Sequence, residues 1–212
     1  EKEVLIREVH HRVKNNLAAI VGLFNLQRQN INDQHALTAL TELSNRIQAM
    51  SLVHEKLYRS ESLARINFQD YLKSLISHLR TLYGSRDIDC RIEAQGVELS
   101  LDMAVPCGMI VSELVTNALK YAFPADWRPV SAEKRQIFVQ LACLDETFTL
   151  SVADNGGGLP DTFDWNSANT LGLILTKMLG EHQLGGHFTL IKSPGVRFTL
   201  SFPSSQRRKA NA

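Results

Sequence analysis

The sequence of 212 residues has few cysteines, few prolines and no long apolar run. Its three cysteines, Cys90, Cys107 and Cys143, are far apart, odd in number and without metal-ligand spacing. They indicate buried thiols in a reducing compartment and not a disulfide framework. No stretch approaches the ~20 apolar residues that span a bilayer, and no signal peptide is visible. The sequence therefore predicts a cytoplasmic protein with no membrane segment in this chain.

Neither sign of charge is in excess, because 23 Lys and Arg residues oppose 22 Asp and Glu residues. A chain so balanced lacks the electrostatic footprint of a nucleic-acid-binding protein, so no nucleic-acid partner is expected. Hydrophobic residues make up 44% of the chain, enough for the core of one large domain or two small ones. The sequence begins without Met inside a helical pattern, which indicates a piece of a longer protein.

Two amphipathic helices are predicted at the N-terminal end. Between Val4 and Gln29 there is no proline and one glycine, and apolar residues recur at alternating spacings of four and three. After the polar segment 30–34 the pattern resumes, so a short link is expected to join the helices as an antiparallel hairpin. The expected seam comprises Ile6, His10, Val13, Leu17, Ile20, Phe24, Leu40, Leu43, Ile47, Met50, His54 and Leu57. Because one hairpin cannot cover both its faces, we expect two copies to pair as a four-helix bundle in a homodimer.

Helical and strand patterns are mixed after Ile66. Helices are predicted over 68–79, 103–122 and 173–181, and strands over 88–93, 136–144, 147–153, 187–192 and 196–202. This order indicates an α+β fold in which helices cover one face of a sheet. The expected organisation is a helical hairpin over 1–65, an α+β domain over 66–203 and a disordered tail over 204–212.

Three short motifs in the α+β domain point to a nucleotide. Glu113 and Asn117 lie four residues apart, so one helix face presents a carboxylate and a metal-ligating amide. Asp154 ends a strand, where it can accept a hydrogen bond from an exocyclic amine, and the glycines after it allow close approach to the backbone. The segment 170–173 opens a helix, whose N-terminus attracts phosphate. Each motif alone fits a solvated face, a hairpin turn or a routine helix entry, whereas the ordered set indicates a nucleotide site.

The sequences SELVTNALKYAFP, DNGGGLP and TLGLILTKMLG resemble the Asn box and the two glycine boxes of the GHKL ATPases, with the spacing of sensor histidine kinases. The upstream EVHHRVKNNL is similar to the phosphoacceptor box of the HHRVKNN-type kinases, relatives of the HWE class. The resemblance covers about 5–202. It implies a GHKL α/β sandwich behind the hairpin, and a protein histidine kinase that uses ATP and Mg²⁺. Such a kinase phosphorylates its own histidine and passes the phosphoryl group to an aspartate of a response regulator receiver domain.

The same resemblance implies roles for the matching residues. Asn117 would ligate the Mg²⁺ that bridges the ATP phosphates, Asp154 would contact the adenine amine, and Glu113 would be a polar or catalytic group beside the γ-phosphate. The other residues expected to contact ATP or shape its pocket and lid are Lys120, Tyr121, Gly156, Gly158, Thr170, Leu171, Gly172 and Leu173. An upstream sensory domain would then be absent from this chain.

Two segments depart from the family pattern. Gly195-Val196-Arg197-Phe198 replaces the Gly-Thr pair often found near the last strands of this ATPase family. The lid between Leu159 and Thr170 is also short, which leaves little material to close over ATP.

Two adjacent histidines are candidates for the phosphoacceptor. Alignment of the more common kinase box, H-E-L-R-[TN]-P-L, places His11 at the acceptor position. Helical phase favours the same residue, because His10 falls on the seam and His11 is rotated outward by about 100°. A neutral imidazole is nucleophilic near physiological pH. We therefore predict His11 as the phosphoacceptor and His10 as a packing residue, with His10 as the alternative acceptor.

Polar residues near His11 have open roles. Arg12 stands where the common box has an acid, and Glu8 could orient the His11 ring, face solvent or form a salt bridge with Arg12. Asn15 matches the position that related kinases use to orient water for dephosphorylating a partner.

Two rival functions also remain. One is a degenerate kinase that serves as a nucleotide-binding scaffold, and the other is a GHKL ATPase without phosphohistidine chemistry.

Overall fold

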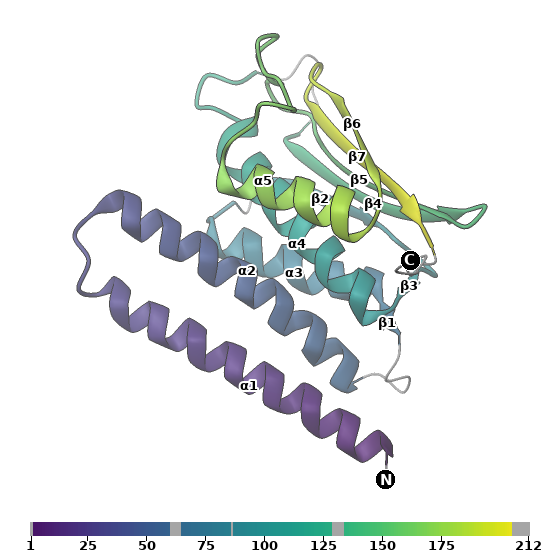
Figure 1. Ribbon diagram of the computed structural model, residues 1–212. Coiled ribbons are helices and arrows are strands. Elements are labelled where there is room, and N and C mark those ends of the chain that lie inside the picture. The colour runs from purple at the N-terminus through teal and green to yellow at the C-terminus, as the bar shows by residue number, and fades with distance from the viewer. Residues whose placement is uncertain (1, 60–64, 86, 129–133, 205–212) are drawn as a thin grey trace.

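The computed structural model describes residues 2–59, 65–85, 87–128 and 134–204. It shows a helical hairpin lying against an α+β sandwich (Figure 1). The hairpin consists of α1 (Lys2–Arg28) and α2 (Gln34–Arg59), which run antiparallel on either side of a short turn. This confirms the predicted hairpin. The expected tail lies, after Ser204, outside the described residues.

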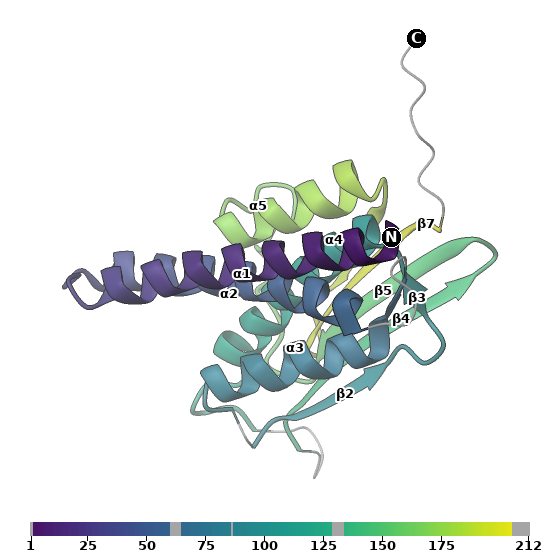
Figure 2. The ribbon, with the colours of Figure 1, turned by 90° about the horizontal axis from the view of Figure 1, so that it is seen from below.

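Five strands form the sheet of the sandwich in the order β2-β4-β5-β7-β6. Their bounds are Asp89–Glu93 for β2, Gln136–Leu144 for β4, Thr147–Asp154 for β5, His187–Ile191 for β6 and Val196–Pro203 for β7. The β2–β4 pair is parallel, and the other neighbours are antiparallel. The helices α3 (Phe68–Leu82), α4 (Leu101–Asn117) and α5 (Leu171–Lys177) cover one face of this sheet (Figure 2). The predicted α+β class is confirmed.

Some local features were not predicted. The strands β1 (Ile66–Asn67) and β3 (Glu98–Leu99) pair as a separate small sheet, and two-residue strands are too short to give a periodic pattern. Wider π-helical turns, η1 (Ala118–Ala122) and η2 (Met178–Gln183), follow α4 and α5. Such turns are common at functional sites. The turn η1 begins directly after Asn117, which is the expected metal ligand.

The hairpin packs on the sandwich through α2. Ala49 and Val53 of α2 are fully buried, and the Tyr71 hydroxyl of α3 donates a hydrogen bond to the Ala49 carbonyl oxygen at 3.2 Å. The sequence indicated a second copy as the partner of the hairpin, so this contact with its own sandwich is an additional finding. The periodic pattern did not reveal this contact, because Ala49 and Val53 lie outside the apolar seam that the sequence predicts.

The seam between α1 and α2 is only partly buried within one chain. Ile20 and Leu43 are 39% and 37% exposed, and Val13 and Leu17 have intermediate burial. The side chains of Ile6 and Leu57 lie outside the described set. Other apolar residues of α1 are well exposed, namely Leu5, Val9, Leu23 and Leu26. The hairpin therefore keeps apolar surface that neither the seam nor the sandwich covers.

A glycine substitution tests the packing of α3 on α4. A Cβ atom on Gly108 would overlap the hydroxyl group of Tyr71, so we expect Gly108→Ala to lower the free energy of unfolding by about 1–3 kcal/mol. Gly22 in α1 has open space at its Cβ position, and Gly22→Ala should raise the free energy by about 0.5–1 kcal/mol through helix propensity. Urea denaturation measures both. Equal stability of Gly108→Ala and the wild type would contradict this packing.

Candidate nucleotide site and phosphoacceptor helix

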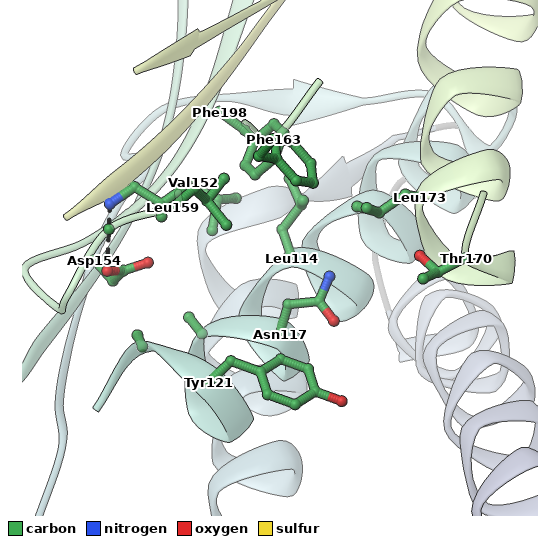
Figure 3. A pocket seen from close by; sticks show the side chains of 14 residues that line it. Leu114, Asn117, Tyr121, Val152, Asp154, Leu159, Phe163, Thr170, Leu173 and Phe198 are labelled. Carbon is green, nitrogen blue, oxygen red and sulfur yellow. Dashed lines mark hydrogen bonds between the residues drawn. The ribbon is translucent and has the colours of Figure 1, made fainter. Parts of the chain in front are cut away.

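A cavity of about 200 Å³ opens between α4, the end of β5 and the lid segment (Figure 3). Its polar groups come from Asn117, Tyr121, Asp154 and Thr170. Its apolar wall is formed by Leu114, Val152, Leu159, Phe163, Leu173, Val196 and Phe198, among others. An apolar cavity with a few convergent polar groups is the usual form of a small-molecule site. This combination would suit a flat heterocycle with a polar edge.

Asp154, the last residue of β5, presents one carboxylate oxygen to the cavity. Its Oδ1 accepts hydrogen bonds from the backbone N–H groups of Gly156 at 2.9 Å and Val196 at 3.3 Å. Burial raises the pKa of the Asp154 carboxyl above its usual value, and the two backbone hydrogen bonds oppose that shift. Among the described residues, no donor approaches Oδ2. That oxygen can therefore accept a hydrogen bond from an exocyclic amine.

Close backbone contacts explain why glycine follows Asp154. A Cβ atom on Gly156 would overlap the carbonyl oxygen of Ala122, and the N–H of Gly157 donates to the same oxygen at 2.9 Å. The glycine loop therefore packs directly on the end of η1. Gly158 lines the cavity, whereas Gly156 lies outside its wall. Gly156 therefore lies behind the cavity, and its expected role in shaping the ATP pocket stays a prediction.

The segment that departs from the family pattern also belongs to the site. Gly195 has a φ of +66° and lies against the carbonyl of Asp154, which leaves no room for a Cβ atom. Val196 and Phe198 line the cavity, and the N–H of Val196 orients Asp154. Val196 and Phe198 were not among the site residues predicted from the sequence. The available signal was Gly195 itself, because glycine is the residue that most readily adopts a positive φ.

Asn117 ends α4 and directs its amide toward the cavity (Figure 3). Among the described residues, no cluster of three or more His, Cys, Asp or Glu side chains is placed to hold a metal ion. A single amide oxygen suits Mg²⁺, which commonly keeps several waters and takes its remaining ligands from phosphates. The donor set therefore fits a metal ion that arrives with a nucleotide and does not fit an independent metal centre.

Glu113 and Lys120 face the hairpin and not the cavity. The Glu113 carboxylate accepts two hydrogen bonds from Arg46 of α2, at 2.6 Å from Nε and 3.0 Å from Nη2. Both side chains are largely buried, with 6% exposure for Arg46 and 12% for Glu113. Lys120 donates to Glu42 of α2 at 3.0 Å. Two residues expected beside ATP are therefore held by α2, one turn of helix to either side of Asn117.

The start of α5 reaches the same junction. Thr170 and Leu173 line the cavity as expected, but Leu171 is 60% exposed and lies outside the wall. A Cβ atom on Gly172 would overlap the Glu113 carboxylate. The absence of a side chain at Gly172 thus allows α5 to approach the Arg46–Glu113 pair.

The two histidines of α1 have different environments. His10 is 8% exposed, and its Nδ1 lies 3.1 Å from Nδ1 of His54 in α2. Burial lowers the pKa of both imidazoles, and for His54 the neighbouring His10 lowers it further. His11 is exposed, with Nδ1 3.4 Å from the Asn15 amide nitrogen. This agrees with the helical phase inferred from the sequence, whereas the role of His11 remains a prediction.

Among the roles considered for Glu8, the structure shows the ion pair with Arg12. Its Oε1 accepts a hydrogen bond from Nε of Arg12 at 2.8 Å. Both side chains are exposed, so the pair contributes little to stability.

Comparisons with known proteins agree with this arrangement. Residues 8–83 match the family profile described as histidine kinase, and residues 104–206 match that of the histidine kinase-, DNA gyrase B- and HSP90-like ATPases. Sensor histidine kinase PdtaS of Mycolicibacterium smegmatis is 29% identical over 212 residues, which cover 98% of this chain and 41% of the relative. Blue-light-activated histidine kinase 2 of Erythrobacter litoralis is 26% identical over 211 residues, which cover 96% of this chain and 58% of the relative.

A solved structure resembles nearly the whole chain. The histidine kinase domain of the Erythrobacter litoralis EL346 blue-light activated histidine kinase has a TM-score of 0.68 at 26% identity, covering 95% of this chain and 94% of that one. A helical hairpin followed by an ATPase-like sandwich is thus the arrangement that the two family profiles and this solved structure match. This chain belongs to the histidine kinases. It spans 41% of the length of the first curated relative. No helix among the described residues is long and apolar enough to cross a membrane.

Asp154→Ala should weaken adenine-nucleotide binding, because the acceptor for the exocyclic amine is lost. The expected loss is roughly 1–3 kcal/mol of binding free energy, with reduced discrimination against guanine nucleotides. Calorimetric titration with ATP and GTP measures both effects. Asp126, an exposed aspartate outside the cavity, gives the control variant Asp126→Ala. Unchanged ATP affinity in Asp154→Ala would mean that the glycine loop is only a turn.

A double-mutant cycle tests the contact between the hairpin and the ATPase sandwich. Arg46→Gln leaves the Glu113 carboxylate unpaired in a largely buried place, so it should cost roughly 3–5 kcal/mol of unfolding free energy. Adding Glu113→Gln should recover part of that loss, which gives a clear coupling energy. The exposed pair Arg135–Asp87 is the control, with an expected coupling of about 0–1 kcal/mol. Additive effects of Arg46→Gln and Glu113→Gln would show that the pair does not join the two parts in solution.

Proposed function

We propose that this chain is the transmitter portion of a two-component sensor histidine kinase. ATP binds in the cavity with Mg²⁺, His11 takes the γ-phosphoryl group, and an aspartate of a response regulator receiver domain then receives it. The observation that carries the proposal is that Asn117 and Asp154 face one apolar cavity while α1 presents His11 at the surface. The hairpin would comprise residues 1–65 and the ATPase domain residues 66–203.

Each residue has a defined task in this reaction. Asp154 accepts a hydrogen bond from the adenine amine, and Asn117 contributes its amide oxygen to the metal that neutralises phosphate charge. The neutral imidazole of His11 forms a nitrogen–phosphorus bond as the bond between the γ-phosphorus and the bridging oxygen breaks, so ADP leaves. Asn15, one turn after His11, would orient water when the regulator is dephosphorylated.

The position of α1 supports participation of a second copy. In this structure α1 packs on α2, and α2 lies between α1 and the sandwich (Figure 1). His11 would reach a nucleotide after the hairpin and the ATPase domain rearrange, or from a paired chain. The exposed apolar residues Leu5, Val9, Leu23 and Leu26 give α1 a surface for such a pair. The homodimer thus remains part of the proposal.

The rival functions explain fewer of these features. A nucleotide-binding scaffold would use the Asp154 carboxylate as well, but it needs neither the Asn117 amide in the cavity wall nor an exposed histidine on the hairpin. A GHKL ATPase without phosphohistidine chemistry needs no exposed histidine on the hairpin. The experiment that tests the proposal must therefore follow the phosphoryl group itself.

Labelling with γ-labelled ATP and Mg²⁺ should give acid-labile, base-stable label on the wild-type chain. His11→Gln should remove the label completely and preserve ATP binding, because an amide cannot replace the nucleophile. His10→Gln is the matched control, and it should keep at least part of the label while weakening the packing of α1 on α2 at His54.

Circular dichroism establishes that each variant is folded. Label mapped to His10 would show that the wrong neighbour was assigned as acceptor. An unlabelled wild type that binds ATP would support the scaffold, and ATP turnover without label would support the plain ATPase.

A further inference from the structure

The lid between the glycine loop and α5 forms three hydrogen bonds with Lys192. Nζ of Lys192, which directly follows β6, donates to the carbonyl oxygens of Asp161 at 3.1 Å and Phe163 at 2.7 Å. The carbonyl oxygen of Lys192 accepts from the N–H of Leu159 at 3.0 Å. One residue therefore binds the lid at three points.

A second lysine holds the far half of the lid. Nζ of Lys177 in α5 donates to the carbonyl oxygen of Asn166 at 3.0 Å and lies 4.9 Å from the ring centroid of Trp165. The Trp165 ring packs on Phe188 and Phe198, with centroid separations of 5.2 and 5.1 Å. The near half of the lid is thus held by Lys192, and the far half by the hydrogen bond from Lys177 to Asn166 and by the packing of Trp165.

These anchors act on residues that form the wall of the cavity. Leu159 and Phe163 of the lid line it, and so does Phe198, on which Trp165 packs. Hydrogen bonds from an ammonium group are stronger than those between neutral groups. Ordering a loop costs conformational entropy, and a loop ordered during folding does not incur that cost when a ligand binds. The wall can therefore be in place before a nucleotide arrives.

We propose that Lys192 is a positioning residue for the nucleotide, because it fixes the short lid and so holds Phe163 in the cavity wall of the free protein. This inference rests on the proposed function, in which ATP occupies the cavity. The short lid is then already ordered as part of the cavity wall, so no long segment has to close over the ligand. Lys192 itself does not line the cavity, so its effect on the nucleotide is transmitted through the lid.

Binding measurements on the whole chain test this role. Lys192→Met keeps most of the aliphatic stem and removes the donors, so the Kd and KM for ATP should rise about tenfold, which corresponds to about 1.4 kcal/mol. The kcat at saturating ATP should change little, since the lysine does not touch the reacting atoms. Lys192→Arg should restore most of the affinity, because its guanidinium can donate to both carbonyls. Lys73→Met, at an exposed lysine of α3, is the matched control with wild-type values expected.

The order of the lid can be measured without a nucleotide. The chain has two tryptophans, so Trp127→Phe leaves Trp165 as the sole tryptophan, whose emission can be excited selectively. Acrylamide should quench Trp165 weakly in this background, with or without ATP. With Lys192→Met added, quenching should be strong in the free protein and fall when ATP binds.

The outcomes separate this inference from the proposed function. Equal quenching and equal ATP affinity in Lys192→Met and its parent would overturn the role of Lys192. Equal loss of kcat in Lys192→Met and Lys192→Arg, with KM unchanged, would also overturn it. A wild-type chain that binds no ATP would overturn the proposed function, whereas the quenching without nucleotide would still report whether Lys192 orders the lid.

Discussion

The buried ion pair between Arg46 and Glu113 is the contact on which the arrangement of the two parts depends. It joins the hairpin helix α2 to α4, and Gly172 brings α5 against the same carboxylate. A buried charge without its partner is costly, so α2 cannot leave this place without new partners for both side chains. A displacement of α2 would therefore act on Glu113, which lies about one helical turn before Asn117. The hairpin and the candidate nucleotide site therefore meet at this junction.

The sequence predicted the parts of this protein better than their assembly. The periodicities of α1, α2 and α3 and of the five long strands are local properties, and they placed these elements within a few residues. The motifs placed Asn117, Asp154 and Thr170 at one cavity. Arg46 gave no signal, because an arginine on a polar helix face looks like any solvated residue until its partner, 67 positions later, is brought to it. Val196 and Phe198 were missed for the same reason, since β7 reaches the cavity through sheet pairing with β5.

The glycines of the site allow close packing between segments of the backbone. Gly156 and Gly195 let η1, the end of β5 and the start of β7 approach one another more closely than side chains would allow. The backbone N–H groups of Gly156 and Val196 then fix one oxygen of Asp154 and leave the other for the cavity. The polar group that would select the base is thus oriented by main-chain atoms, which substitution elsewhere in the wall does not remove. The lid is held in a different way, because the Lys192 side chain donates to its backbone carbonyls.

In the π-helical turn η1, the adjacent residues Lys120 and Tyr121 point to different parts of the structure. Lys120 contacts Glu42 of the hairpin, and Tyr121 lines the cavity. A π-helical turn holds an extra residue compared with an α-helical one, so it changes the phase of the side chains that follow Asn117. With ordinary helical spacing, these two side chains would point in other directions. The extra residue therefore shifts the helical phase, so that one short segment contacts the hairpin helix α2 on one side and lines the candidate nucleotide cavity on the other.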